Sequence, residues 1–307
     1  MMMSEIDLNN ELNEIFSCPE LSGVLTKKIP KLDKNAKKTK LVLSGGGIKG
    51  FSLLGSLHAL EKMDLIKYIK TYAGSSIGAC TSVLMSIGYK ADELMEILKM
   101  VDFRKMTGAD LSNLLTQYGL DDGKRFEMVI RKLISAKNID PDITFGEMYS
   151  MTNKIVIITA TCVNDKKVYY FSHKTVPEMP VITAIRMSIS IPIYFVPVTY
   201  KGKMYIDGGC MDNYPMQLFS NDLDDVIGIH LNDVKSPIDE IKNIEDYMYH
   251  TLQCLLEGMT CNSMKEYEKF TVRIDVTGSN NVNFVVNEEE KQKLFDQGFD
   301  AVMNRFE

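Results

Sequence analysis

The stretch Gly74-Ser75-Ser76-Ile77-Gly78 decides the fold of this chain, because it joins two segments of different character. Residues 68–73 before it form an apolar run typical of a buried strand, and residues 79–87 after it favour a helix. A tight turn between a strand and a helix leaves the hydroxyl of its central residue exposed. The flanking glycines remove the Cβ atoms that such a turn would crowd. The pattern therefore predicts a candidate nucleophile at Ser76, with a small-residue turn capped by a serine as the alternative.

Strand-like and helix-like segments alternate on both sides of this turn. Before it, residues 41–44 favour a strand and residues 49–63 a helix. After it, the patterns predict helices over residues 91–115, 123–136, 181–189, most of 237–267 and from 287 onwards, and strands over residues 155–162, 167–172, 193–199, 204–207, 226–230 and 269–276. Such alternation predicts an α/β layered domain with a mostly parallel central sheet.

The composition is that of a globular protein and excludes several function classes. The chain has 307 residues, 45% of them apolar and 25% charged. Its net charge of −6 gives no argument for a nucleic-acid partner. The apolar runs are far shorter than the roughly 20 residues that span a bilayer, and residues 1–13 lack the pattern of a secretory signal. We therefore expect an intracellular protein, cytoplasmic or peripheral on membranes, and the sequence leaves its oligomeric state open.

The cysteines predict free thiols in a reducing compartment, because no pair has C-x-x-C spacing. There are six: Cys18, Cys80, Cys162, Cys210, Cys254 and Cys261. No group of His and Cys has metal-ligand spacing, and the chain has no acidic D-x-D-x-D loop that would bind Ca²⁺. We expect neither a metal nor a cofactor.

Residues 1–37 are interpreted as an N-terminal extension of a domain over residues 38–307. Residues 5–17 favour a short amphipathic helix. A lysine-rich stretch follows, with Lys27, Lys28, Lys31, Lys34, Lys37, Lys38 and Lys40. Such a charge run is typical of a solvated linker, and weak contact with anionic lipid is the alternative.

The glycine-rich loop Gly45-Gly46-Gly47-Ile48-Lys49-Gly50 follows the first strand and leads into a helix. Uncovered backbone N–H groups at a helix N-terminus form an anion site, for either a phosphate or the oxyanion of an acyl intermediate. The loop lacks the P-loop pattern, but Gly45, Gly47 and Gly50 do satisfy the G-x-G-x-x-G spacing of dinucleotide sites. The next strand ends in the serine turn without an acidic residue for a ribose, which favours the oxyanion interpretation.

A third element, Ile206-Asp207-Gly208-Gly209, delivers an aspartate from a strand into a glycine turn, and Asn213-Tyr214-Pro215 follows it. An aspartate at a strand end can act as a general base if it reaches the serine hydroxyl. The alternative is an ordinary Asp-Gly turn.

Together, the glycine loop, the serine turn and the Asp-Gly-Gly turn occur in an order and at spacings that resemble the patatin-like phospholipase family. Residues 184–192, with Phe195 and Pro197 after them, resemble the family's segment before the Asp-Gly-Gly turn. The resemblance covers about residues 38–232. It implies a three-layer α/β sandwich and a lipid acyl hydrolase that cleaves acyl esters of (lyso)phospholipids.

The resemblance also implies roles for particular residues. Ser76 becomes the nucleophile and Asp207 the general base of a Ser-Asp dyad, which lacks the histidine of serine proteases. Backbone N–H groups of Gly46 and Gly47, with that of Ile77, would hold the oxyanion. The oxyanion and substrate-binding positions implied in this way are Gly45, Gly46, Gly47, Lys49, Gly50 and Ile77. Lys49 matches the family's basic position, with loop support and attraction of an anionic head group as alternatives.

His230 offers a competing interpretation. It ends the strand predicted over residues 226–230, and the order Ser76, Asp207, His230 is that of an α/β-hydrolase triad. The Asp-Gly-Gly turn favours the dyad.

The substrate is less well defined by the sequence. Residues 94–106 carry more apolar side chains than one core-facing stripe needs, so part of this stretch is a candidate acyl-chain groove, lid or membrane contact. We expect a phospholipid or other acyl-ester substrate and transient contact with a membrane surface. An acyltransferase with the same dyad and a partner-activated or non-catalytic lipid-binding protein are the alternatives.

Overall fold

The computed structural model describes residues 29–105, 108, 110–233, 240–241, 247, 250–251, 254, 266–276 and 286–306. The chain divides into two units, Met1–Lys31 and Leu32–Glu307, and the second contains all the described helices and strands. The helix predicted over residues 5–17 and most of the helical stretch predicted over 237–267 lie outside the described residues.

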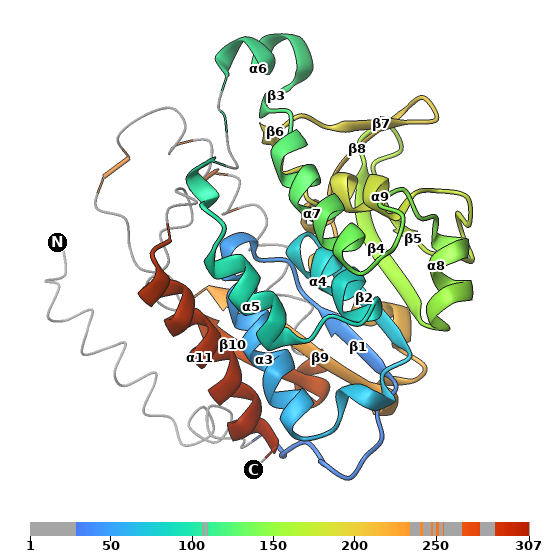
Figure 1. The fold of residues 1–307 in the computed structure, drawn as a ribbon, viewed down its shortest axis with the longest axis vertical. Helices are drawn as coiled ribbons and strands as arrows, with labels where there is room; N and C mark the ends of the chain where they lie inside the picture. Colours follow the sequence, from blue (N-terminus) through green and yellow to red (C-terminus); the bar gives the residue numbers. More distant parts are fainter. Residues whose placement is uncertain are drawn as a thin grey trace, which may run out of the picture. The chain divides into compact units, whose positions relative to one another are not determined.

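A mostly parallel sheet of eight strands forms the centre of the second unit (Figure 1). Its strands lie in the order β10 (Thr271–Val276), β9 (Val226–Asp233), β1 (Lys40–Leu43), β2 (Thr71–Ser75), β4 (Ile155–Cys162), β8 (Lys203–Asp207) and β7 (Val198–Tyr200), and β5 (Lys167–Phe171) also pairs with β4. The neighbours from β10 to β4 are parallel, and the pairs made by β5, β8 and β7 are antiparallel. The predicted fold class is confirmed.

Alternate strand residues build two cores on opposite faces of the sheet. Leu41 and Leu43 of β1 belong to the larger core, whereas Val42 packs with Tyr214 and Met216 in a smaller core. The helices that contribute to the larger core or pack around it are α3 (Gly50–Lys62), α4 (Ile77–Ser86), α5 (Ala91–Lys99), α7 (Lys124–Ala136), α8 (Phe145–Thr152), α9 (Val181–Ser188) and α11 (Glu288–Phe306). The sheet thus carries a helical layer over the face to which Leu41 and Leu43 point.

Capping chemistry explains where several helices begin. Asn287 and Glu290 form a capping box at the start of α11, through N–H···O contacts of 3.0 and 2.8 Å. The Asp122 side chain accepts the Lys124 N–H at 3.0 Å at the start of α7. α8 is not among the helices that the sequence predicts, although Thr144 supplies the side-chain cap at its N-terminus.

The structure corrects two predicted elements. The helix predicted over 91–115 is broken: α5 ends at Lys99, a 3₁₀ turn covers Phe103–Lys105, and α6 spans Leu111–Gln117. The strand predicted over 193–199 is split into β6 (Ile193–Phe195) and β7, because Pro197 between them cannot donate to a sheet. β6 instead pairs with β3 (Gly119–Asp121) in a separate two-stranded sheet, and α6 lies at the top of Figure 1, away from the central sheet.

Within the described part of the chain, no helix combines the length and the apolar character needed to cross a bilayer.

Candidate active site

The turn after β2 has the geometry of a nucleophile elbow. Ser76 joins β2 to α4 with φ 52° and ψ −124°, a backbone conformation that non-glycine residues rarely adopt. A Cβ atom at Gly74 would lie 2.4 Å from the carbonyl carbon of Gly78. A Cβ atom at Gly78 would lie 2.5 Å from the carbonyl oxygen of Leu43, at the end of β1. Glycine is therefore required at both places for the strand, turn and helix to pack this closely.

The end of β8 brings Asp207 to the same place. β4 pairs with β2 through Thr159 opposite Ser75, and with β8 through Ala160 opposite Asp207. β2 pairs with residues 155–159 of β4 and β8 with residues 160–162. β5 pairs with residues 158–162 and therefore occupies one edge of β4 beside both of these segments, which leaves β2 and β8 on the other edge. The two strands therefore meet end to end, with Ser76 directly after one of them and Asp207 at the end of the other.

Asp207 is a buried carboxylate beside this serine. Burial raises the pKa of Asp207 to about 7, although the Ser76 side chain and the Gly209 N–H both lower it. The Gly209 N–H donates to Oδ1 at 2.7 Å. Among the described residues, no hydrogen bond of standard geometry reaches Oδ2. A carboxyl group with this pKa has both protonation states available near neutral pH, which suits a general base.

The glycine loop lies against the elbow. The Gly45 N–H donates to the Asn213 carbonyl oxygen at 3.0 Å, and a Cβ atom at Gly45 would lie 3.1 Å from that of Ser76. Gly47 adopts a left-handed φ of 55°. The N–H groups of Gly46 and Gly47 donate to no acceptor in the described ranges. They are available to a developing oxyanion next to Ser76.

The remaining predicted residues surround the loop and the elbow. Ile77 is the first residue of α4, and a Cβ atom at Gly50 would lie 2.5 Å from its Cγ1 atom. Lys49 ends a 3₁₀ turn, Gly47–Lys49, and is only 7% exposed. Its burial agrees better with loop support than with attraction of a head group at the surface.

Asn213 has no role predicted from the sequence, but it connects the glycine loop with the Asp-Gly-Gly turn. Its Oδ1 atom occupies the space beside two glycines, 2.2 Å from where a Cβ atom of Gly45 would lie and 2.9 Å from that of Gly209. The Asn-Tyr-Pro sequence after Asp207 was the visible signal. The tertiary fold is what places the Asn213 side chain beside the glycine loop.

His230 takes no part in a hydrogen-bonded triad. Its side chain is 4% exposed and packs edge-on against Tyr214, with ring centroids 5.0 Å apart. Neither ring nitrogen has a hydrogen-bond partner among the described residues. Burial, with a smaller contribution from Arg273, lowers the pKa of His230 to about 4. Among the described residues, His230 therefore makes no hydrogen bond to Asp207 or Ser76.

His58, Glu61 and Asp92 form a second titratable group, between α3 and α5. Their ligand-type atoms lie within 4.8 Å of one another. The two carboxylate oxygens of Glu61 accept the Ala91 N–H at 3.2 and 3.3 Å. Glu61 thus caps the N-terminus of α5.

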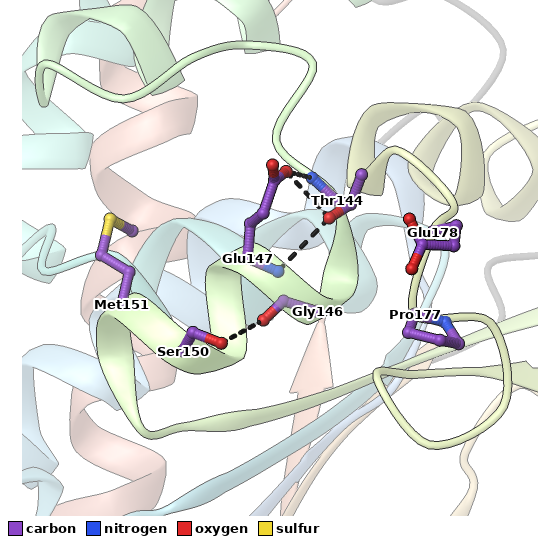
Figure 2. Close-up of a pocket in the computed structure, with 7 residues that line it drawn as sticks. All are labelled: Thr144, Gly146, Glu147, Ser150, Met151, Pro177 and Glu178. Carbon is purple, nitrogen blue, oxygen red and sulfur yellow. Dashed lines mark hydrogen bonds between the residues drawn. The ribbon is translucent and has the colours of Figure 1, made fainter.

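An open pocket of about 610 Å³ lies along α8 (Figure 2). It is lined by Thr144, Gly146, Glu147, Ser150, Met151, Pro177 and Glu178. Figure 2 shows Glu147 turned back to Thr144 in the capping box. The lining includes none of the predicted site residues, so this pocket is separate from the candidate active site.

The apolar stretch over residues 94–106 is mainly structural. Leu94 is buried in α5, and Phe103 packs edge-on against Phe51 with ring centroids 5.8 Å apart. Met100, after the end of α5, is 80% exposed. In the described part of this stretch, the region around Met100 therefore remains as the candidate for the predicted lid or membrane contact.

The comparisons with known proteins agree with this geometry. The family profile described as patatin-like phospholipase matches residues 41–220. An uncharacterized protein of Acanthamoeba polyphaga mimivirus is 33% identical over 65% of this chain and 67% of its own length. A probable lipid hydrolase of Invertebrate iridescent virus 6 is 33% identical over 58% of this chain, a match that spans only 62% of the relative. The uncharacterized protein YqhO of Bacillus subtilis is 27% identical over 84% of this chain and 94% of its own length.

Solved structures show the same fold. VipD from Legionella pneumophila aligns with 93% of this chain and 72% of its own length, with a TM-score of 0.58 and 16% identity. The type III effector protein ExoU aligns with 88% of this chain and 53% of its own length, with a TM-score of 0.53 and 16% identity. With the family profile covering more than half of its residues, the chain belongs to the patatin-like phospholipase family.

Proposed function

We propose that the protein is a lipid acyl hydrolase in which Ser76 attacks an acyl ester and Asp207 is the general base. The observation that carries this proposal is the end-to-end meeting of β2 and β8 on the edge of β4, which brings an elbow serine to a buried carboxylate. The domain that performs the reaction is proposed to span residues 38–307, with residues 1–37 as an extension.

The first half-reaction forms an acyl-enzyme. Asp207 takes the proton of Ser76 as its oxygen attacks the ester carbonyl carbon. The N–H groups of Gly46, Gly47 and Ile77 hold the negative oxygen of the tetrahedral intermediate, and each such donor typically contributes about 10²–10³ in rate. The protonated Asp207 then gives its proton to the departing alcohol as the ester bond breaks.

The second half-reaction restores the enzyme. Asp207, again a carboxylate, takes a proton from water, and the resulting hydroxide attacks the acyl carbon on Ser76. Collapse of the intermediate releases the fatty acid and returns the proton to the Ser76 oxygen. The raised pKa of Asp207 supports both roles, because the group must accept and donate a proton at one pH.

The proposed substrates are acyl esters of phospholipids and lysophospholipids, reached by transient contact with a membrane surface in an intracellular compartment. The family membership and the relative named probable lipid hydrolase support this substrate class. The exposed Met100 supplies an apolar side chain for such contact.

Turnover of a chromogenic acyl ester and of phospholipid vesicles by the purified protein tests this function. We expect hydrolysis of both, with losses of at least 10³-fold in Ser76→Ala and Asp207→Ala. Products formed with added lysolipid separate hydrolysis from acyl transfer. Wild-type protein that binds vesicles without releasing fatty acid would instead indicate a partner-activated or lipid-binding relative.

A further inference from the structure

We propose that the segment Ser188-Ile189-Ser190, which begins at the last residue of α9, fixes the separation of Ser76 and Asp207, with Ser188 as a positioning residue. The proposal rests on the proposed function, since it concerns how the same two residues are held. In the sequence, this segment carries a family resemblance and no predicted role.

Ser188 contacts the nucleophile side of the site. Its Oγ atom accepts the backbone N–H of Ser76 at 2.8 Å, and its side chain is fully buried. Ser76 holds a φ of 52°, which is a strained conformation for a non-glycine residue. A hydrogen bond to the N–H of that residue stabilises the strained turn and fixes the direction of its side chain.

Ser190 contacts the other side of the site. Its carbonyl oxygen accepts the backbone N–H of Asp207 at 2.8 Å. Only Ile189 separates it from Ser188, so one three-residue segment contacts both Ser76 and Asp207. This contact complements β4, which pairs with both β2 and β8 from within the sheet.

Arg186 anchors this segment to the start of α7. Its guanidinium group donates to the Ser190 Oγ atom at 3.3 Å and to the Asp122 carbonyl oxygen at 3.0 Å. It also lies 3.9 Å from the Glu127 carboxylate and 5.8 Å from the ring centre of Phe195. An arginine that is 6% exposed and held on several sides resists displacement of the serines next to it.

The need for such a brace follows from the topology. β2 and β8 meet at their ends and pair with β4 rather than with each other. A shift of about 1 Å between reacting groups can cost roughly 10²-fold in rate. The Ser188–Ser190 segment closes the connection between the two strand ends and limits such a shift.

The Ser188→Ala variant tests this role, with Ser86→Ala as the matched control. Ser86 is 2% exposed and donates to the Val83 carbonyl oxygen within α4, so the control also removes a buried hydroxyl. We expect Ser188→Ala to lower kcat on a soluble ester at least tenfold with KM changed less than twofold. The control should keep kcat within threefold.

The titration of Asp207 gives a readout that a purely structural role would not change. The Ser76 side chain lowers the pKa of Asp207, so misplacing that side chain should raise it. Besides Ser76 and Gly209, the group that faces this carboxylate is Cys210, whose own thiol pKa is raised by burial and by Asp207. Nuclear magnetic resonance of ¹³C-labelled aspartate should show a higher apparent pKa in Ser188→Ala than in wild type and no change in Ser86→Ala.

Ser188→Cys is the second variant, because it removes the strong oxygen acceptor without leaving a cavity. A raised pKa of Asp207 in both Ser188 variants supports the proposal, even if the wild-type protein hydrolyses no ester. An unchanged titration in folded Ser188→Ala or Ser188→Cys overturns it. If the proposed function is wrong, the result is different: wild-type protein shows no turnover that depends on Ser76.

Discussion

The surroundings of Ser76 and Asp207 differ from the segment around α6 in how the chain holds them. The dyad residues are 8% and 5% exposed and lie at strand ends of the eight-stranded sheet. The α6 segment is joined to the rest through the two-stranded β3–β6 sheet, and Leu115 and Tyr118 there are 81% and 63% exposed. The proposed chemistry thus lies where several strands fix the geometry, whereas the exposed Leu115 and Tyr118 lie in a segment that few strands hold.

Apart from removal of Ser76 or Asp207 themselves, crowding the glycine loop should have the largest effect on activity. Gly45→Val places its Cβ atom 2.2 Å from the position of the Asn213 Oδ1 atom and 3.1 Å from the Ser76 Cβ atom. We expect kcat on a soluble ester to fall by about 10²–10³, because the oxyanion donors move. Gly202→Asn is the control: its site has φ 75° and open space around it, and asparagine tolerates that region. Equal activity in both variants would show that the glycine loop takes no part in catalysis.

The pH dependence should follow Asp207. Because the base must be a carboxylate, kcat/KM should rise about tenfold per pH unit up to the raised pKa of about 7 and then level off. The same shift acts on stability in the opposite sense. An aspartate whose folded pKa is raised contributes stability that is fully present below its unfolded pKa of about 3.9 and is lost as pH rises through about 7.

Asp207→Asn tests both consequences in one variant. It should be inactive. Its stability should also not fall between pH 4 and 7 as that of wild type does, so at pH 8 it should unfold at a higher temperature than wild type. The difference is at most about 4 kcal/mol, since one pKa unit corresponds to about 1.4 kcal/mol. Thermal unfolding across this pH range checks it. A variant with the same pH dependence as wild type would contradict the assignment of the raised pKa to Asp207.

The exposed Met100 side chain should affect activity only on interfacial substrates, and its effect should be smaller than that of the glycine loop. Met100→Glu is expected to reduce activity on vesicles a few-fold and to leave a short soluble ester unchanged, because a charge at a lipid surface is costly. Met151→Glu, at a 52% exposed methionine of α8, is the control. Equal losses on both substrates in Met100→Glu would mean that the side chain does not act at an interface.

His230 should matter least of all. Both of its ring nitrogens are without partners among the described residues, so an apolar side chain of similar size removes no described hydrogen bond. We expect His230→Met to keep kcat within threefold of wild type and to unfold at the same or a higher temperature. Loss of activity from a folded His230→Met protein would restore the triad interpretation.

The sequence predicted well those features that are set by neighbouring residues. The elbow around Ser76 and the glycine loop follow from short-range turn chemistry, and Asn287 with Glu290 marks the start of α11 for the same reason. The approach of Asp207 to Ser76 depends on the pairing of both β2 and β8 with β4. No local pattern encodes that pairing, so the family resemblance was needed to suggest it.

Other features escaped because tertiary contacts overrode local patterns. The apolar run after residue 91 was interpreted as one long helix, but Lys291 of α11 donates to the carbonyl oxygens of Leu98, Lys99 and Val101, where α5 ends. The roles of Ser188 and Asn213 depend on contacts with residues more than 100 positions away. The α8 helix did have a local signal, because Thr144 and Glu147 have the spacing of a capping box.

The most direct test of the central claim is to trap the acyl-enzyme. Wild-type protein quenched during turnover of a slowly hydrolysed ester should gain the mass of one acyl group, on a peptide that contains Ser76. Ser76→Ala should gain none, and Asp207→Asn should gain it far more slowly. An acyl adduct on another residue, or undiminished turnover by Ser76→Ala, would contradict the account.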